Sequence, residues 1–247
     1  MACRNASAFV IQSLESFVNQ DHIPLEMVVI DDNSEDDSAI KVQKFIDNTR
    51  VDNIRLIRLD QQRGCAGARN VGIGIAKGKY IAVWDADDFY EKDRISATLK
   101  YMEKNSLDAC GSWAKTVDDN SNIIEEYDYP PSDNDTITWM LPSKKNPMID
   151  PSCIIKKQSL VISGCWSTDA KISLAPDLDL WFRMASKGMR LGNMQRFLTF
   201  YRIQPNSNTI SKNKEMISHH VEVVRKHYGK VELNRHEQYA KNQRMVY

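Results

Sequence analysis

The chain has 247 residues, of which 42% are hydrophobic, and its 33 basic side chains balance its 33 acidic ones. This length allows one sizeable domain or two small ones, and a net charge of zero argues against nucleic acid as the main partner, which would require a basic face. The five scattered cysteines form no Cys-x-x-Cys pair, which indicates reduced thiols rather than a disulfide framework or a zinc site, and no apolar run reaches the roughly 20 residues that cross a bilayer.

The amino-terminal part of the chain predicts one helix and one buried strand. Apolar residues recur on one face over residues 9–18, which is typical of an amphipathic helix. Four apolar residues over 27–30 predict a buried strand, and Asp32 stands at its carboxyl end. Ser34, with Asp37 three positions later, resembles a capping box, so these acids could instead serve the next helix.

A helix over residues 38–48 and a strand over residues 54–59 follow, so strands and helices alternate. This alternation is typical of a parallel α/β sheet. In such sheets ligands bind beyond the carboxyl ends of the strands. Asp32 and Asp85 both follow a predicted strand, and we therefore expect them at the same edge of the sheet.

Residues 63–88 combine a glycine-rich turn, a short helix and an apolar strand that runs into Asp85, Asp87 and Asp88. Because the strand is buried, its end is fixed, and Asp85 and Asp87 face the same side if the extended geometry continues. Clustered carboxylates repel one another unless a positive charge lies between them, and a hard divalent cation is their natural partner. The alternative is an acidic loop that caps the next helix, which begins near Asp93.

The second half of the chain predicts mixed helices and strands. The predicted elements are a helix around Leu99, strands over residues 109–117 and 123–127, a long proline-bearing loop over 129–151, a short strand over 152–155, a helix that begins at Pro176, a strand over 197–202, a helix over 213–228 and a charged tail over 232–247.

Two aspartates mark the helix that begins at Pro176 and ends at Gly188. Asp177 and Asp179 are two positions apart, so on a helix they cannot face the same point. One is therefore available to a site and the other is not. An aspartate in this first turn could alternatively serve only to stabilise the helix dipole.

The glycine turn, the strand and its acidic end together resemble the nucleotide-sugar-binding core of the family 2 glycosyltransferases, whose fold is called GT-A. The resemblance implies an α/β fold with a Rossmann-like, mostly parallel central sheet flanked by helices. The matching residues are Gly64, Ala68, Arg69, Asn70, Gly72, Ala76, Gly78, Tyr80, Ile81, Asp85, Ala86, Asp87 and Asp88.

In this family a buried first strand precedes the first helix, and here only residues 1–3 could form its end. We therefore expect a first strand truncated by about half a dozen residues, the usual length of a strand. Because an absent central strand leaves ladder hydrogen bonds unpaired, either the sequence is truncated, the sheet tolerates a short strand, or something outside the chain completes it.

The resemblance also implies roles for the acids and the arginines. Asp32 would accept a hydrogen bond from the base, and a carboxylate suits the ring N–H of uracil, thymine or guanine. Asp87, with Asp85 or Asp88, would hold Mn²⁺ or Mg²⁺ against the donor diphosphate. A guanidinium fork suits diphosphate oxygens, and we favour Arg69 over Arg63 for this role, although each could be a solvated surface charge. The nucleotide-binding candidates are Ala2, Arg4, Asp32, Arg63, Arg69, Asp85 and Ala86.

Residues 175–185 are similar to the family's Glu-Asp-x-Asp-Leu-Trp-x-Arg segment, and this register places the catalytic aspartate at Asp177. Pro176 replaces the preceding acid of the family pattern, which leaves Asp177 as the lone candidate base. Gln204 stands where the family commonly has histidine, and we assign it no metal.

The resemblance thus implies a metal-dependent, inverting glycosyltransferase of polysaccharide biosynthesis. It would move a sugar from a nucleoside diphosphate (UDP or dTDP, then GDP) to a hydroxyl of a glycan, a lipid-linked acceptor or a protein. We expect a GT-A domain over 1–211, with a nucleotide-binding half (1–117) and an acceptor-side half (118–211), and a helical tail over 212–247.

For location and partners, we expect a cytoplasmic protein, free or in peripheral contact with a membrane, with no nucleic-acid partner. Two other functions remain open. A sugar nucleotidyltransferase usually has a glycine-rich basic loop after its first strand, and residues 1–7 lack one. A non-catalytic nucleotide-sugar-binding module would be consistent with the shortened first strand.

Overall fold

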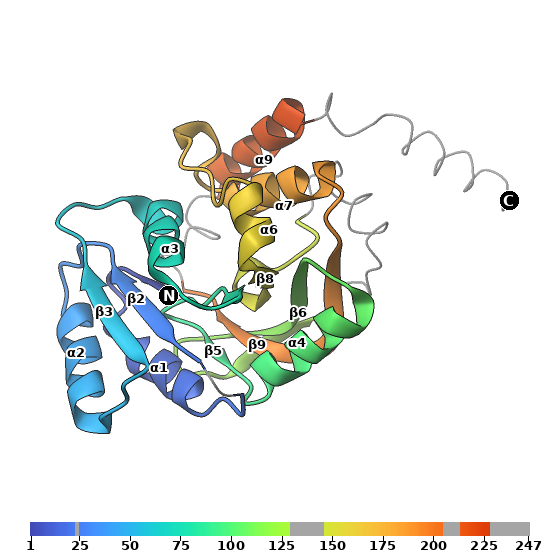
Figure 1. The fold of residues 1–247 in the computed structure, drawn as a ribbon. Coiled ribbons are helices and arrows are strands. Elements are labelled where there is room, and N and C mark those ends of the chain that lie inside the picture. The colour runs from blue at the N-terminus through green and yellow to red at the C-terminus, as the bar shows by residue number, and fades with distance from the viewer. Residues whose placement is uncertain (23–24, 129–145, 205–212, 228–247) are drawn as a thin grey trace, which may run out of the picture.

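The computed structural model describes residues 1–22, 25–128, 146–204 and 213–227. Strands lie in the middle of the molecule and helices flank them, so the predicted α/β architecture with a central sheet is confirmed (Figure 1). In chain order the elements are β1 (Ala2–Cys3), α1 (Val10–Val18), β2 (Met27–Asp31), α2 (Ser38–Thr49), β3 (Ile54–Arg58), α3 (Gly64–Ile75), β4 (Tyr80–Ala82), β5 (Phe89–Tyr90), α4 (Arg94–Asn105), β6 (Ala109–Val117), β7 (Ile123–Tyr127), η2 (Asp150–Ser152), β8 (Ile154–Lys156), α6 (Lys157–Ile162), η3 (Ala170–Ile172), α7 (Pro176–Ser186), β9 (Leu191–Arg202) and α9 (Asn213–His227).

The first sheet has the order β1-β2-β3, and its strands are all parallel. Every residue of β2 is buried, because helices cover both of its faces. Met27 and Val29 pack with α1 and α2, whereas Val28 and Ile30 pack against Ala68 of α3 on the opposite face. The side chains alternate as they must along a strand, and burial of both faces explains the unbroken apolar run.

The second sheet has the order β4-β8-β6-β9-β5, with β7 paired to β6. It mixes directions, because β6 and β9 run parallel whereas its other pairs are antiparallel. Within the described ranges the two sheets meet at an isolated parallel bridge between Ala2 and Asp85. This bridge joins the two sheets into one central sheet at the carboxyl ends of β1 and β4.

Most predicted elements have nearly their predicted bounds, and β6 and β7 match them at both ends. β4 ends at Ala82 rather than at residue 84. β9 begins at Leu191 rather than at residue 197, because it pairs with β6 from its first residue onward. Much of the predicted loop over 129–151, residues 205–212 and the tail over 232–247 lie outside the described residues. The proposed domain division stays a prediction.

A layer of α6, α7 and α9 lies over the second sheet (Figure 1). Leu178, Trp181 and Phe182 of α7 are buried in one apolar cluster, and Val223 of α9 belongs to the same cluster. These residues form the packed face of α7, and α9 packs against it through the same cluster.

Asp179 ties α9 to α7 by polar contacts. Its carboxylate is fully buried, accepts a hydrogen bond from Arg183 Nε at 2.7 Å, and lies 2.8 Å from His227 Nε2 and 3.1 Å from Lys226 Nζ. Burial alone would raise the pKa of Asp179, but the hydrogen bond of His227 and the charge of Arg183 outweigh it and hold that pKa well below its usual value. Asp179 is thus an anchor for α9.

We expect Asp179→Asn to destabilise the protein at pH 7 by about 3–5 kcal/mol, because it removes the buried carboxylate that pairs with the half-buried Arg183 and the buried His227. A carboxyl group whose pKa is lower in the folded state stabilises the fold above its unfolded pKa, near 3.9. The difference from the wild type should therefore shrink as the pH falls below about 4, as measured by urea unfolding from pH 7 to pH 3. The exposed Asp119 serves as the control, and a difference independent of pH would contradict this account.

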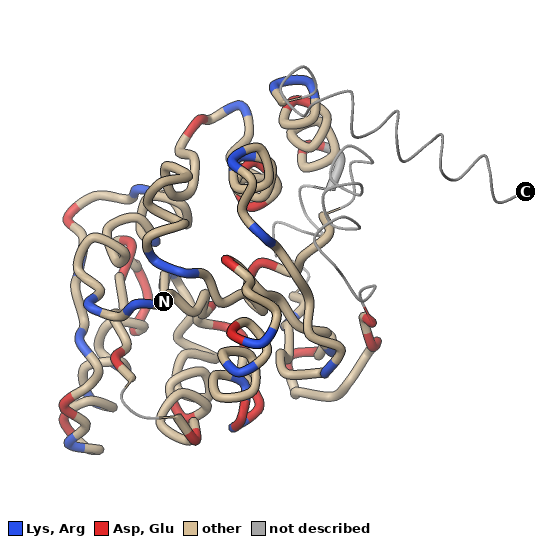
Figure 2. Tube along the Cα trace, turned by 45° about the vertical axis from the view of Figure 1, so that its right-hand side comes forward, with Lys and Arg blue, Asp and Glu red and all other residues tan. Residues whose placement is uncertain are grey.

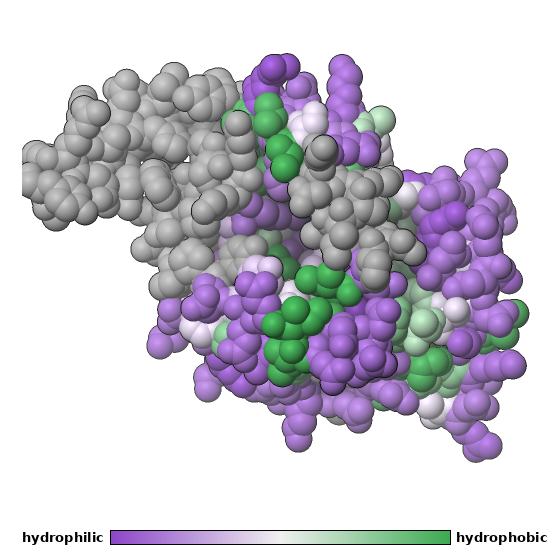
Figure 3. Space-filling view, turned by 180° about the vertical axis from the view of Figure 1, so that it is seen from behind, coloured by the Kyte–Doolittle hydropathy of each residue, from purple (hydrophilic) through white to green (hydrophobic). Residues whose placement is uncertain are grey.

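Basic and acidic segments are interspersed along the described chain (Figure 2), and the face seen from behind is mostly hydrophilic (Figure 3). Exposed large hydrophobic residues include Ile123 and Ile124 on β7. Among the helices of the described part, none has the length and hydropathy of a membrane span.

Candidate active site

The carboxyl ends of β1, β2 and β4 lie side by side. The backbone N–H of Asp32 donates to Cys3 O at 2.8 Å, and Ala2 pairs with Asp85 on the other side of β1. Asp32 and Asp85 therefore flank the same short strand, as the alternation of strands and helices predicted.

The carboxylate of Asp32 is buried and holds the start of α3. It accepts hydrogen bonds from the backbone N–H groups of Arg63 at 2.7 Å and Gly64 at 2.9 Å. Gly64 has a φ of +72°, a conformation that glycine adopts without strain. Arg4 donates from Nη1 to the backbone oxygens of Asp32 and Asn33, both at 3.0 Å. In this structure Asp32 therefore acts as a cap on α3, and its contact with a base stays a prediction.

We expect Asp32→Asn to lower the stability of the nucleotide-free protein by about 2 kcal/mol, because the amide can accept only with its single oxygen and turns an N–H₂ group toward a donor. This corresponds to a fall in Tm of about 4–8 °C for a chain of this size. Differential scanning calorimetry without nucleotide measures it, with the exposed Asp60 as the matched Asp→Asn control. An unchanged Tm would show that the cap contributes nothing.

Arg69, on α3, lies between two carboxylates from distant parts of the chain. Its Nη2 bonds Asp85 Oδ1 at 2.7 Å, its Nη1 bonds Asp150, and its guanidinium stands 5.3 Å from the ring centroid of Trp166. Arg69 Nε is buried and has no partner among the described groups. Arg63, by contrast, is exposed, and the preference for Arg69 over Arg63 as the diphosphate-binding arginine stays a prediction.

Asp150 joins this cluster from η2. The pKa of Asp150 is raised to about 7. Burial is the main cause, the charges of Asp177 and Asp85 also raise this pKa, and the charge of Arg69 lowers it. Asp150 Oδ1 is buried with no partner among the described groups. Three carboxylates therefore lie close enough to affect the pKa of Asp150 around the guanidinium of Arg69: those of Asp85, Asp177 and Asp150 itself.

The remaining acids after β4 are held by the end of β9. Arg202 donates from Nε to Asp87 O at 2.9 Å and from its backbone N–H to Asp88 Oδ1 at 2.8 Å. Gln204 Nε2 donates to Asp87 Oδ2 at 3.2 Å. Burial and the charge of Asp85 raise the pKa of Asp87 to about 6. Burial and the charges of Asp87 and Asp85 raise the pKa of Asp88 well above its usual value.

These acids fit a hard divalent cation. All the donor atoms are oxygens, the carboxylates raise one another's pKa, and Asp88 Oδ2 is buried without a partner among the described groups. No group of three His, Cys, Asp or Glu side chains in the described ranges is arranged to hold a metal by itself. The acids that follow β4 therefore have the donor chemistry that a hard divalent cation requires, and their role as metal ligands stays a prediction.

Asp177 lies in the first turn of α7 and faces away from Asp179. Asn146 Nδ2 donates to Asp177 Oδ2. Burial raises the pKa of Asp177, whereas the backbone N–H of Leu178 and the charges of His220 and Arg69 lower it. The two aspartates therefore divide as their spacing predicted, with Asp179 buried in ion pairs and Asp177 turned toward the Arg69 cluster.

Other site residues were missed at the level of sequence. They are Asp150, Asn146 and Arg202, whose partners described above are distant in sequence. Gln204 was singled out from the sequence, but its contact with Asp87 was not. The sequence feature that could have indicated Asp150 is an acidic residue directly before a proline in an otherwise polar loop. Ala86, a predicted nucleotide-binding residue, has a buried side chain within the core, so it could reach a ligand only through its backbone.

Comparisons with known proteins show the family to which this chain belongs. The family model of glycosyl transferase family 2 matches residues 1–162. An uncharacterized glycosyltransferase of Methanocaldococcus jannaschii is 28% identical over 208 residues, which cover 84% of this chain and 70% of the relative. The UDP-Glc:alpha-D-GlcNAc-diphosphoundecaprenol beta-1,3-glucosyltransferase of Escherichia coli is 29% identical over 224 residues, which cover 88% of this chain and 81% of the relative.

Solved structures show the same fold. Staphylococcus aureus TarS 1–349 in complex with UDP-GlcNAc superposes with a TM-score of 0.69 at 18% identity, covering 85% of this chain and 59% of that one. The mannosyltransferase from Pyrobaculum calidifontis in complex with GDP-Man and Mn²⁺ has a TM-score of 0.69 at 16% identity, covering 91% and 62%. This chain spans about three fifths of those two solved chains. The predicted GT-A fold is confirmed, and because the family model covers more than half of the sequence, the chain belongs to glycosyl transferase family 2.

Proposed function

We propose that this protein transfers a sugar from a nucleoside diphosphate sugar to an acceptor hydroxyl, with a divalent cation and with inversion at the sugar. The gathering of Asp85, Asp150 and Asp177 around Arg69 carries the proposal. Such a site suits a diphosphate that binds together with a cation. The cation would compensate the surplus negative charge of the carboxylates, and the guanidinium of Arg69 would compensate the negative charge of the diphosphate.

On the donor side, Asp87 with Asp85 or Asp88 would hold the cation, and the guanidinium of Arg69 would turn toward the diphosphate oxygens. The bound cation supplies Lewis-acid stabilisation of the leaving diphosphate. Gln204 and Arg202 hold Asp87 by its side chain and its backbone oxygen respectively. Their role would be to fix the orientation of this carboxylate before the donor binds.

On the acceptor side, Asp177 would accept the proton of the attacking hydroxyl. The hydroxyl oxygen forms a bond to the anomeric carbon, the bond from that carbon to the diphosphate oxygen breaks, and the nucleoside diphosphate leaves. Burial raises the pKa of Asp177, which makes the carboxylate a stronger base at neutral pH. A single displacement of this kind inverts the configuration of the sugar.

The choice of nucleotide follows from the base-binding role proposed for Asp32. A carboxylate accepts from the ring N–H of uracil, thymine or guanine, and the solved neighbours were crystallised with UDP-GlcNAc and with GDP-Man. We therefore propose UDP, dTDP and GDP donors. The E. coli relative is named for transfer to a sugar carried on diphosphoundecaprenol, so a lipid-linked glycan is the first acceptor class to test.

A thermal-shift screen of UDP-, dTDP-, GDP- and ADP-sugars, with and without Mn²⁺, tests the proposal. At a donor concentration of about 100 Kd, we expect Mn²⁺ and one of the first three donors to raise Tm by about 5–10 °C, and the ADP-sugar to have no effect. Release of nucleoside diphosphate with acceptor would then support transfer. Pyrophosphate release from a nucleoside triphosphate and a sugar phosphate would favour a nucleotidyltransferase, and binding without turnover would favour a binding module.

A further inference from the structure

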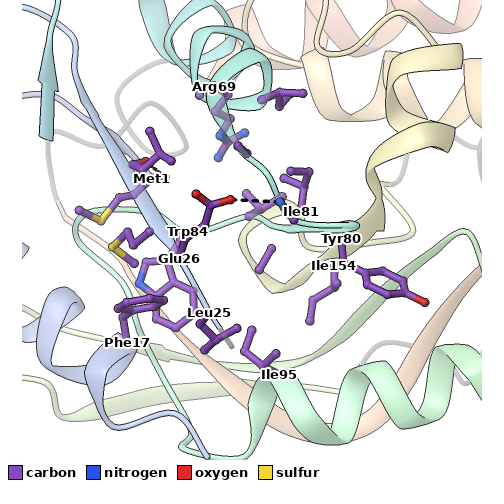
Figure 4. Close-up of a pocket in the computed structure, with 18 of the residues that line it drawn as sticks. Met1, Phe17, Leu25, Glu26, Arg69, Tyr80, Ile81, Trp84, Ile95 and Ile154 are labelled. Carbon is purple, nitrogen blue, oxygen red and sulfur yellow. Dashed lines mark hydrogen bonds between the residues drawn. The ribbon is translucent and has the colours of Figure 1, made fainter. Parts of the chain in front are cut away.

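A five-residue segment, 146–150, contacts both sides of the candidate site. At its amino end Asn146 Nδ2 donates to Asp177 Oδ2 on α7, and at its carboxyl end Asp150 bonds Nη1 of Arg69. The side chain of Arg69 lines a cavity of about 370 Å³ between β2 and β4 (Figure 4). The segment therefore lies between the carboxylate proposed as the base and the guanidinium proposed to bind the diphosphate. We call it the bridging segment.

The backbone of the bridging segment is held by buried residues. Met148 is fully buried in the apolar cluster that also contains Leu178 of α7. Asn193 of β9 is buried as well and donates from Nδ2 to Pro147 O at 2.8 Å. Pro147 also restricts the residue before it to extended conformations. The backbone of Asn146 is thus held in place, although the residue itself is only half-buried.

The amide group of Asn146 is oriented by its own segment. Its Oδ1 accepts a hydrogen bond from the backbone N–H of Met148 at 3.3 Å, so its Nδ2 is the group that faces Asp177. A hydrogen bond donated to a carboxylate favours the charged form of that carboxylate. Because the bond is made to Oδ2, it also fixes the rotation of the carboxylate and leaves Oδ1 to receive a proton.

The residue before the base cannot replace Asn146 in this role, because Pro176 has no backbone N–H and no polar side chain. The charged and titratable groups that act on Asp177 come from three other elements. They are Arg69 of α3, Asp150 of η2 and His220 of α9. Asn146 is neutral, so its contribution to the base is a hydrogen bond and an orientation rather than a charge.

We propose that Asn146 is a positioning residue for the base. Its Nδ2 would hold Oδ2 of Asp177, so that Oδ1 takes the proton of the acceptor hydroxyl. The hydroxyl oxygen bonds to the anomeric carbon in the same step, and the nucleoside diphosphate leaves with the electron pair of the broken bond. This inference rests on the proposed transfer reaction. Because Asn146 acts through Asp177, its removal should lower the rate only while Asp177 is a carboxylate.

A double-mutant cycle of Asn146→Ala and Asp177→Asn tests this dependence. In the wild type we expect Asn146→Ala to lower kcat by about 10–100-fold, the usual effect of losing a hydrogen bond to a charged group. KM for the donor should change by less than about twofold, since the donor does not contact Asn146. In Asp177→Asn the same substitution should change kcat by less than about twofold, because the two residues act as a unit. Asn48→Ala, at an exposed position on α2, is the matched control and should keep the kcat of each background.

The carboxyl titration of Asp177, followed by ¹³C NMR without donor, measures the hydrogen bond without any turnover. Burial already raises the pKa of Asp177. Because Asn146 donates to the charged form, Asn146→Ala should raise this pKa further. Asn146→Asp has nearly the same size and places a second carboxylate beside Asp177, so it should raise the pKa more than alanine does. Asn48→Ala should leave the titration unchanged.

The outcomes separate positioning from a structural role. Equal fold losses of kcat in the two backgrounds would overturn the proposal, since Asn146 would then act on the fold or on the donor. An unchanged kcat in Asn146→Ala, or an unchanged titration of Asp177 in that variant, would overturn it as well. Wild-type turnover in Asp177→Asn is a different result, because it refutes the proposed base itself and with it any role of Asn146 in the transfer.

Discussion

Asp177→Asn is expected to lower the turnover number by about 10²–10⁴-fold, the usual contribution of a general base, while donor affinity stays unchanged. The asparagine is nearly isosteric and can still accept from Asn146, so the site keeps its shape. Burial raises the pKa of Asp177, which means that the carboxylate form is disfavoured in the fold, so the neutral amide should not reduce stability. Initial rates of nucleoside diphosphate release and titration calorimetry with the donor measure the two quantities.

The same variant tests whether Asp177 acts as a general base or only stabilises the dipole of α7. If Asp177 only stabilised the first turn of α7, the substitution would cost about 0.3–1 kcal/mol of stability and would leave the rate intact. Asp52→Asn, at an exposed position, controls for the general effect of removing a carboxylate. Wild-type turnover in Asp177→Asn, combined with a lower Tm, would refute the assignment of the base.

The edge of the sheet at which the acids gather could be predicted because it depends only on strand direction. Asp32 and Asp85 each end a short apolar run, and parallel strands bring their carboxyl ends to one edge. The opposite orientations of Asp177 and Asp179 could likewise be predicted from helical spacing. Both predictions need only the local pattern of the sequence: the alternation of strands and helices for the first, and the helical spacing of two residues for the second.

The partners of these acids could not be predicted in the same way, because they depend on the packing of distant segments. Arg69 meets Asp150, 81 residues further along the chain, and Arg202 meets Asp88 across 114 residues. The capping of α3 by Asp32 spans 31 residues. No short-range pattern encodes such contacts, and in each of them a charged group or a backbone N–H finds a partner only after the sheets have assembled.

The shortened first strand connects fold and site. β1 pairs with β2 at Ala2 and Cys3, and it reaches Asp85 by the bridge from Ala2. The carboxyl edge that carries Asp32 and Asp85 is therefore assembled, although β1 has only two residues. A sheet that is paired at this edge can hold the candidate site in place.

Asp87 is the carboxylate through which metal and donor binding should be coupled. Burial and the charge of Asp85 raise its pKa to about 6, so its charged form is disfavoured in the protein alone. Its orientation is fixed by Gln204 and by the bond of Arg202 to its backbone oxygen. An asparagine at this position can keep both contacts and lose only the charge, which makes it a cleaner variant than alanine.

We expect Asp87→Asn to abolish the Mn²⁺-dependent part of donor binding, a loss of at least about tenfold in affinity, since a hard cation held by fewer anionic oxygens binds more weakly. Titration calorimetry of the donor with and without Mn²⁺ measures this dependence. Asp93→Asn is the matched control. Asp93 follows Asp87 closely in the sequence, and its partly exposed carboxylate is paired with Arg196. This variant should keep the full Mn²⁺ effect. An unchanged heat of donor binding with Mn²⁺ in Asp87→Asn would show that the cation is held elsewhere, and the donor side of the proposed mechanism would then have to be reassigned.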